Sequence, residues 1–301
     1  YDKRFGGTGI DIISSVTKTS NGTLFLAGTT TSGISGNKTT ANFGQEDFWV
    51  VKTDANGNKL AEFTYGGNQK DELKSISSIN DNLFLLFGTS NSGISGNKTV
   101  ANLNNSQDFW AIWIDANGSI LHQEVYGGNS NETAIKALVL KDGNIIFSGH
   151  SASEISGAKS QNARGENDFW VIKTNANGQK IWDKTLGGIK DEVLVAMDST
   201  VEGNLIFLGN TKTITPSFER QSPGFSHGSL NEIFVQDVWL IELNQNGDII
   251  TDYILGSCGY DVSTPLLETE SGDLFCMPTI TGTFNCSINY LDIGGINQRY
   301  P

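Results

Sequence analysis

Carboxylates are the side chains of this sequence whose spacing could do chemistry. In five places an acidic residue follows a Gly-Gly or Gly-Ser pair at a similar distance: Asp11, Asp71, Glu132, Asp191 and Asp261. Glu72 and Glu192 lie directly beside two of them. Two nearby carboxyl groups are the acid and base of most glycosidases, provided that their surroundings give them unequal pKa values. Because these carboxylates recur in every repeat, we interpret them instead as residues of turns and strand ends that accept backbone hydrogen bonds.

Metal ligands are not indicated by the remaining polar residues. Residues 54–58 begin like an oxygen-rich calcium loop, but the later bidentate Glu of such a loop is missing, so a hairpin turn is the better interpretation. Three histidines are scattered without partner spacing: His122, His150 and His227. The sequence therefore predicts no catalytic residue, no metal site and no cofactor.

A glycine-rich phrase occurs twice, at residues 32–38 and 92–98. It lacks the Gly-Lys-Ser/Thr that a phosphate-binding loop carries before its helix. Its repetition predicts a loop that folds back on its own sheet, with the isoleucine (Ile34 in the first copy, Ile94 in the second) as the anchor.

All three cysteines lie near the C-terminus. Cys276 and Cys286 are placed symmetrically about Thr281-Gly282, so a hairpin there would bring them close enough for a disulfide, if the compartment is oxidising. A pair of reduced thiols is the open alternative. Cys258 is expected to remain a free, buried thiol. Metal ligation is the poorer interpretation because no Cys-x-x-Cys or His cluster accompanies them.

Composition and charge exclude several classes of partner. The 301 residues carry a net charge of −13 and no basic cluster. Nucleic acid is therefore an unsuitable ligand, since phosphate binding needs a concentrated positive surface. No run approaches the roughly 18 to 20 apolar residues that a membrane-spanning helix requires.

A unit of about 60 residues organises the chain. Each unit carries a Gly-Gly pair, an alternating segment, a turn, an apolar segment, a long polar loop, an Asp-x-Trp phrase and an Asn-Gly turn. No segment has a 3.6-residue apolar period, so we expect four short strands per unit and almost no helix. The units cover residues of about 8–67, 68–128, 129–188, 189–257 and 258–292, with a further strand at 1–7.

Five such sheets predict a five-bladed β-propeller, an all-β fold with four antiparallel strands per blade, as one domain over residues 1–301. A four-stranded sheet repeated at this period buries its faces only by stacking on its neighbours, and a ring leaves no end sheet exposed. The Trp of each Asp-x-Trp phrase then packs between sheets. The Asn-Gly turns are expected to be type I′. The strand at 1–7 should pair with the last blade and close the ring, although the tail at 292–300 could reach the same edge.

The phrase at residues 182–188, the acidic pair Asp191-Glu192 and the strand and turn at 168–178 resemble envelope propeller repeats of bacteria that use the type 9 secretion system. The resemblance covers nearly the whole chain and is specific for the fold. It implies a location in the periplasm or at the cell surface, and binding or scaffold duties. It would also fit a subunit that plugs the outer-membrane translocon of that system.

Long loops are the expected binding surface. The loops at 29–46, 90–107, 150–167 and 211–236 should share one face of the propeller, and loops on a rigid scaffold carry binding. The longest loop holds the aromatic and basic residues that suit a protein interface: Phe218, Arg220, Phe225 and His227. Alternatively, this loop only covers the channel mouth. The sequence thus favours a non-enzymatic protein-binding or scaffold subunit. The alternative is a carbohydrate-binding or glycoside-processing propeller, marked by an open pocket with unequal carboxylates beside exposed aromatic residues.

Overall fold

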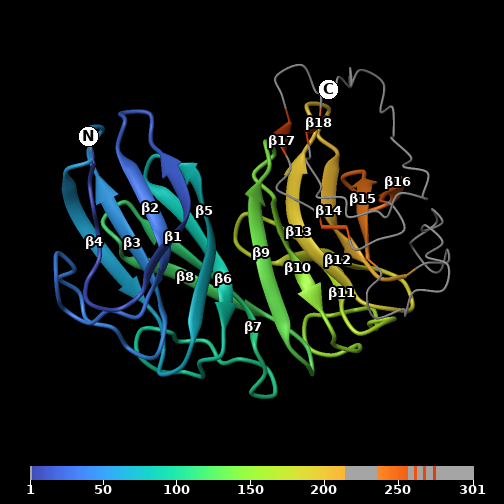
Figure 1. Cartoon of the computed structure of the whole chain (residues 1–301), viewed down its shortest axis with the longest axis horizontal. Coiled ribbons are helices and arrows are strands. Elements are labelled where there is room, and N and C mark those ends of the chain that lie inside the picture. The colour runs from blue at the N-terminus through green and yellow to red at the C-terminus, as the bar shows by residue number, and fades with distance from the viewer. Residues whose placement is uncertain (1, 214–235, 257–260, 263–266, 269–273, 276–301) are drawn as a thin grey trace. The chain divides into compact units, whose positions relative to one another are not determined.

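A computed structural model describes residues 2–213, 236–256, 261–262, 267–268 and 274–275 of the chain (Figure 1). These residues form strands, turns and loops without any helix, as the sequence predicts. Four sheets of four antiparallel strands follow one another along the chain, and each is a simple meander. Within the described ranges, no helix has the length and apolar character needed to cross a membrane.

The strand bounds follow the repeat. The first sheet holds β1 (Asp11–Lys18), β2 (Leu24–Thr30), β3 (Asp47–Thr53) and β4 (Lys59–Tyr65). The second holds β5 (Asp71–Asn80), β6 (Leu83–Ser90), β7 (Asp108–Asp115) and β8 (Ile120–Tyr126). The third holds β9 (Glu132–Val139), β10 (Ile145–Ser151), β11 (Asp168–Thr174) and β12 (Lys180–Leu186). The fourth holds β13 (Glu192–Ser199), β14 (Leu205–Thr211), β15 (Asp237–Leu243) and β16 (Ile249–Leu255). A two-stranded ladder joins β17 (Leu267–Glu268) to β18 (Leu274–Phe275).

The chain divides into two compact units. One comprises Tyr1–Asn162 and Ile172–Asp183, and the other Ala163–Val171 and Lys184–Pro301. In the first unit, β1 lies beside β5 and β5 lies beside β9, so the sheets stack face to face with their first strands adjacent (Figure 1). Equivalent hydrogen bonds join the sheets, because the hydroxyl of Ser15 accepts from the N–H of Ile76 and that of Ser75 accepts from the N–H of Ala137. This stacking of successive meanders is propeller-like.

Tryptophans of the Asp-x-Trp phrase form the core between sheets, as predicted. One is fully buried in the third strand of every sheet: Trp49, Trp110, Trp170 and Trp239. In the first unit the ring of Trp110 lies 4.9 Å from that of Phe48 in the preceding sheet, measured between centroids. In the second unit the same contact joins Trp239 to Phe169 at 5.1 Å. Rings of this size remove a large apolar area from water, so this contact stabilises the packing of neighbouring sheets.

The Asn-Gly turns are not type I′, and that prediction is wrong. In the turn between β3 and β4, the N–H of Gly57 donates to the carbonyl of Asp54, and Gly57 has a φ of +75°. Asn56 is not among the residues with positive φ, whereas a type I′ turn needs positive φ at both central residues. The loop is therefore three residues long, with glycine in the left-handed position. The carboxylate of Asp54 accepts from the N–H groups of Asn56 and Asn58, which confirms a turn role for that residue.

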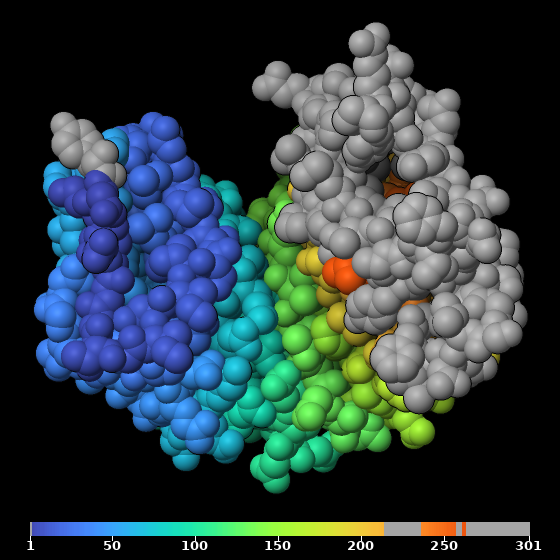
Figure 2. Space-filling model, in the orientation of Figure 1, coloured from blue at the N-terminus to red at the C-terminus, as the bar shows by residue number. Residues whose placement is uncertain are grey.

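The first sheet has an open face. Ile13 and Val16 on β1 are 44% and 58% exposed, whereas Leu73 and Ile76 at the equivalent places of β5 are 0% and 4% exposed. Figure 2 shows the first repeat, in blue, at the surface in that view. The burial of β5 comes from the sheet that precedes it, and no sheet within the described ranges of the chain covers β1 in this way.

The N-terminal segment forms no strand over residues 2–10, but it makes the contacts expected of one. The side chain of Asn37 donates to the carbonyl of Arg4 and accepts from the N–H of Gly6, at 2.6 and 2.8 Å. Asn97 in the next repeat makes the same two bonds with Thr64 and Gly66, where β4 ends. The segment therefore lies against the first sheet as an outer strand lies against the sheet that follows it.

Candidate functional site

A buried carboxylate organises the turn between one sheet and the next. In the second repeat, Asp71 accepts hydrogen bonds from the N–H of Gly67 at 2.7 Å and from the hydroxyls of Ser90 and Ser92 at 2.5 and 2.9 Å. The carboxylate thus ties the Gly-Gly turn to the end of the second strand. Burial raises the pKa of Asp71, and these three donors oppose the shift.

The same arrangement recurs in the first, third and fourth repeats, which confirms that the acids of these repeats serve turns and strand ends. The carboxylates that accept from the glycine N–H four residues earlier are Asp11, Asp71, Glu132 and Glu192. In the fourth repeat Glu192 takes this place and Asp191 does not, so the prediction that Asp191 is the equivalent residue is wrong. Asp191 instead accepts from Lys212 and Asn167. A constant spacing of four from the second glycine would have identified Glu192.

The hydroxyl donors were missed at the level of sequence. They form a Ser/Thr-x-Ser/Thr pattern after each second strand: Thr30 and Ser32, Ser90 and Ser92, Ser151 and Ser153, Thr211 and Thr213. Both hydroxyls of a pair donate to the carboxylate of the same repeat, as Ser151 and Ser153 do to Glu132. The first hydroxyl of each pair follows the carboxylate of its repeat by 19 residues, and this constant spacing is a signal that could have found the pair.

We expect Ser92→Ala to destabilise the protein by about 1–3 kcal/mol, because a buried carboxylate loses one of its donors. Ser92→Thr is the matched control, since Thr213 makes this contact in the fourth repeat. Urea denaturation of both variants measures the difference. Equal stabilities for the two variants would show that the hydroxyl contributes nothing.

A second carboxylate lies beside the first at the start of each third strand. Asp108 accepts from the N–H of Leu103 at 2.6 Å and from the hydroxyl of Ser106 at 2.9 Å. Burial raises the pKa of Asp108 to about 7, and the adjacent Glu132 carboxyl adds to the shift. Burial likewise raises the pKa of Asp47 to about 6 in the first repeat. Asp108 and Glu132 are thus a close pair of carboxyl groups.

This pair cannot reach a substrate, because Asp108 and Glu132 are both 0% exposed. Gly127 covers them so closely that an added Cβ would lie 2.1 Å from an oxygen of Asp108. That contact explains why the first residue of the Gly-Gly pair is glycine. The two carboxyl groups therefore have a structural role in the Gly-Gly turn.

Lysine, and not isoleucine, anchors the glycine-rich loops. The Nζ atom of Lys98 donates to the carbonyl of Val100 at 2.5 Å and to Asn102 at 2.9 Å, and it lies 5.5 Å from the centre of the Trp110 ring. Burial lowers the pKa of Lys98 to about 8. The equivalent lysines in the first three repeats are all buried: Lys38, Lys98 and Lys159.

The isoleucines of these loops point outward, which corrects the prediction that they are anchors. Ile34, Ile94 and Ile155 are 68%, 68% and 62% exposed. Each follows the end of a second strand by four residues and belongs to the first compact unit. The three second strands end at the same edge of their sheets, so the isoleucines lie on the predicted long-loop face.

Backbone hydrogen bonds make each loop tip rigid. Ser95 and Lys98 exchange both main-chain hydrogen bonds, at 3.2 and 3.0 Å, and Gly96 between them has a φ of +58°. The same bridge joins Ser35 to Lys38 and Ser156 to Lys159. The same backbone bridge therefore recurs in three consecutive repeats, each beside an outward apolar side chain.

The remaining predicted site residues lie outside the described part of the chain. These are the contact candidates Phe218, Arg220, Phe225 and His227, and the cysteines Cys258, Cys276 and Cys286. Of the other histidines, His122 lies on β8 with its Nε2 atom 3.0 Å from the Glu124 carboxylate.

No family model matches the sequence, and no curated protein matches it significantly. The structure is similar to hydrazine synthase of Kuenenia stuttgartiensis, with a TM-score of 0.46 and 13% identity over 88% of this chain and 73% of that one. It is similar to a puromycin hydrolase, with a TM-score of 0.45 and 8% identity over 91% of this chain and 36% of that one, so this chain spans about a third of the hydrolase. It is also similar to BamB from Moraxella catarrhalis, with a TM-score of 0.28 and 13% identity over 88% of this chain and 85% of that one. At such identities and TM-scores, none of these likenesses indicates what this chain binds or does.

Proposed function

We propose that this chain is a non-enzymatic β-propeller of the bacterial cell envelope that binds a protein partner through its long-loop face. The observation that carries the proposal is the outward display of one isoleucine from each of three consecutive loops: Ile34, Ile94 and Ile155. A protein channel of the outer membrane is the partner that the sequence resemblance favours.

Repetition distinguishes these isoleucines from ordinary exposed apolar residues. Single apolar side chains are common at protein surfaces and need no explanation. Here the same residue occupies the same place in three loops, and buried lysines and backbone bridges hold each tip in position. Such preorganisation favours binding, because little loop entropy is lost when a partner docks.

A glycoside-processing role receives no comparable support from the described residues. The carboxyl pairs are buried beneath the Gly-Gly turns, and the pocket at β8 is lined by no carboxylate. Most glycosidases hydrolyse their substrate with a pair of carboxyl groups that flank the scissile bond.

The proposal includes a closed ring of five blades, with residues 258–292 as the fifth blade and the segment at 1–7 as its outer strand. Two features support closure. The exposed Ile13 and Val16 occupy positions that a preceding sheet buries elsewhere. Arg4 and Gly6 meet Asn37 as the end of β4 meets Asn97.

Site-specific photo-crosslinking in the native envelope tests the partner-binding face. A photoreactive residue placed at Ile34, Ile94 or Ile155 should give an adduct of one mass that fractionates with the outer membrane. Matched controls carry the same residue in the exposed turns at the opposite edge of the same sheets: Asn56, Asn117 and Asn177. Adducts of equal yield from both edges, or none from the isoleucine positions, would contradict the proposal.

A further inference from the structure

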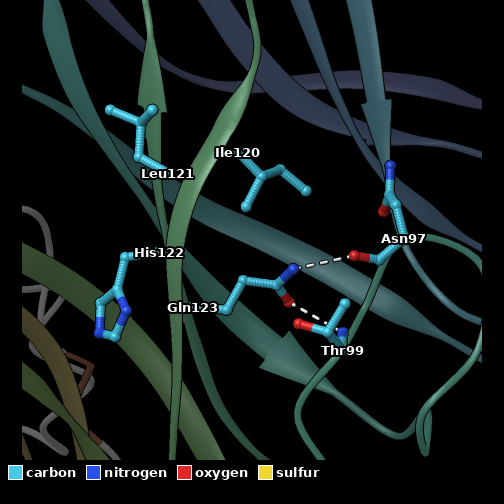
Figure 3. A pocket seen from close by; sticks show the side chains of 6 residues that line it. All are labelled: Asn97, Thr99, Ile120, Leu121, His122 and Gln123. Carbon is cyan, nitrogen blue, oxygen red and sulfur yellow. Dashed lines mark hydrogen bonds between the residues drawn. The ribbon is translucent and has the colours of Figure 1, made fainter.

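A pocket of about 430 Å³ opens at the start of β8, on the outermost strand of the second sheet. Six residues line it: Asn97, Thr99, Ile120, Leu121, His122 and Gln123. Gln123 points across the pocket toward Asn97 and Thr99, whereas the imidazole of His122 points away from them (Figure 3). The amide of Gln123 donates to the carbonyl of Asn97 at 2.9 Å and accepts from the N–H of Thr99 at 3.3 Å.

A lysine fills this space in the first and third repeats. Lys59 donates to the carbonyl of Asn37 and lies 3.2 Å from the carboxylate of Glu62. Lys180 donates to the carbonyl of Ala158 at 2.6 Å and lies 2.7 Å from Asp183. In both sheets the outer strand is thereby joined to the loop that follows the second strand.

The second repeat departs from this pattern at two positions together. Ile120 stands where the first and third repeats have lysine, and Gln123 stands where they have an acid. The fourth repeat also has isoleucine at the first position, Ile249, but keeps an acid at the second, Asp252. Isoleucine has no group that can bond to the carbonyl of Asn97, which Gln123 reaches instead, and a pocket remains beside Ile120. The lysine and the acid of the first and third repeats are both absent, so Ile120 and Leu121 line the pocket together with the polar side chains of Asn97, Thr99, His122 and Gln123.

The same change alters the edge of the sheet. Lysine on an outer strand discourages other chains from pairing with it. Residues 120–123 carry no lysine, and β8 has no ladder partner beyond β7 among the described residues. Leu121 is 60% exposed on this strand. An unpaired strand edge, a pocket beside it and an exposed apolar side chain are the features of recognition by strand addition. In this mode the main-chain hydrogen bonds of the added strand supply the affinity, and pockets select its side chains.

We propose that an extended segment of a protein partner pairs with the outer edge of β8 as a fifth strand and places an apolar side chain in this pocket against Ile120. The half-exposed carboxylate of Glu124 on the same strand favours a segment with a lysine or arginine near the apolar residue. The pocket shares Asn97 and Thr99 with the loop that displays Ile94, but the pairing edge is that of β8, so this proposal does not require a partner at the isoleucines.

A displayed library of random decapeptides, selected on the purified full chain, tests the proposal. Selected peptides should carry an apolar residue close to a basic one, and should protect the β8 amides from hydrogen exchange. The variant with Ile120→Lys and Gln123→Glu restores the pair found in the first and third repeats. We expect it to bind the selected peptides at least about tenfold more weakly, a difference of about 1.4 kcal/mol.

The converse variant keeps the test independent of folding defects. Lys59→Ile with Glu62→Gln copies the second repeat into the first sheet, and should create a second site for the same peptides. Peptides that bind the wild type and the Ile120→Lys, Gln123→Glu variant equally would overturn the proposal. Protection of β8 by neutral oligosaccharides, with no peptide enriched, would overturn the assignment to a peptide.

Discussion

Val16→Asp is expected to destabilise the protein by about 4 kcal/mol or more, the range for an unpaired charge placed in an apolar contact. Val16 is 58% exposed in the structure, and an exposed Val→Asp change would ordinarily have little effect. The expectation follows from the proposed ring closure, in which a fifth sheet would cover this side of β1. Chemical denaturation of the full chain measures it.

Equivalent positions in the repeats give the physical reason. Ile76 on β5 and Met197 on β13 occupy the place of Val16, and they are 4% and 1% exposed. In the first unit, β1 and β2 lie beside β5 and supply its cover. If no sheet covers Val16, the first repeat differs from the next three, whose first strands bury the equivalent position.

Ile12→Asp is the matched control. Ile12 is as exposed as Val16, at 56%, but its equivalent in the second repeat is Glu72, so this position accepts a carboxylate within the fold. Ile12→Asp should therefore leave stability nearly unchanged. If Val16→Asp is equally harmless, β1 faces water and the ring is open.

Local patterns in the sequence predicted most of the fold. Alternation, Gly-Gly pairs and Asn-Gly turns located every strand of the first four repeats, because strand pairing in a meander depends on neighbouring segments. The turn type was wrong because Asn56 and Gly57 fit two loops, and only the register of the flanking strands distinguishes them.

The loop anchors could not be found from hydropathy. Ile94 was expected to be the anchor, since apolar side chains are usually the buried ones, and no role was assigned to Lys98. The loop instead curves so that the ammonium of Lys98 meets carbonyl and amide oxygens of Val100 and Asn102, and the lysine stem packs beneath it. The pocket at β8 depends on a comparison between repeats: only the lysines of the first and third show what Ile120 replaces.

Asp108→Asn should abolish a large pH dependence of stability. Because the pKa of Asp108 is about 7 in the folded chain, the folded state keeps a proton that the unfolded state releases above its ordinary pKa of 3.8. The free energy of unfolding therefore falls as pH rises from about 4 to about 7, by roughly 1.4 kcal/mol per pH unit for one group, and is constant above that. Stability from this group is fully present below the lower limit.

Asparagine removes the titration and keeps the contacts. Its amide oxygen accepts from the N–H of Leu103, and its NH₂ group donates toward Glu132, as the protonated acid would. We expect Asp108→Asn to equal the wild type near pH 4 and to exceed it at pH 8 by on the order of 4 kcal/mol, the integral of that slope. Other groups titrate in both proteins, so they cancel in the difference.

Asp115→Asn supplies the control of opposite sign. Hydrogen bonds from the turn residue Ser119 lower the pKa of Asp115, so its carboxylate stabilises the folded chain above the ordinary pKa, and this contribution is lost as pH falls. Removing that carboxylate should weaken the protein at neutral pH and not in acid. Parallel curves of stability against pH for the wild type and Asp108→Asn would show that Asp108 is ionised in the fold. Hydrogen-bond donors, and not a proton on Asp108, would then have to offset the repulsion between the carboxylates of Asp108 and Glu132 beneath the Gly-Gly turn.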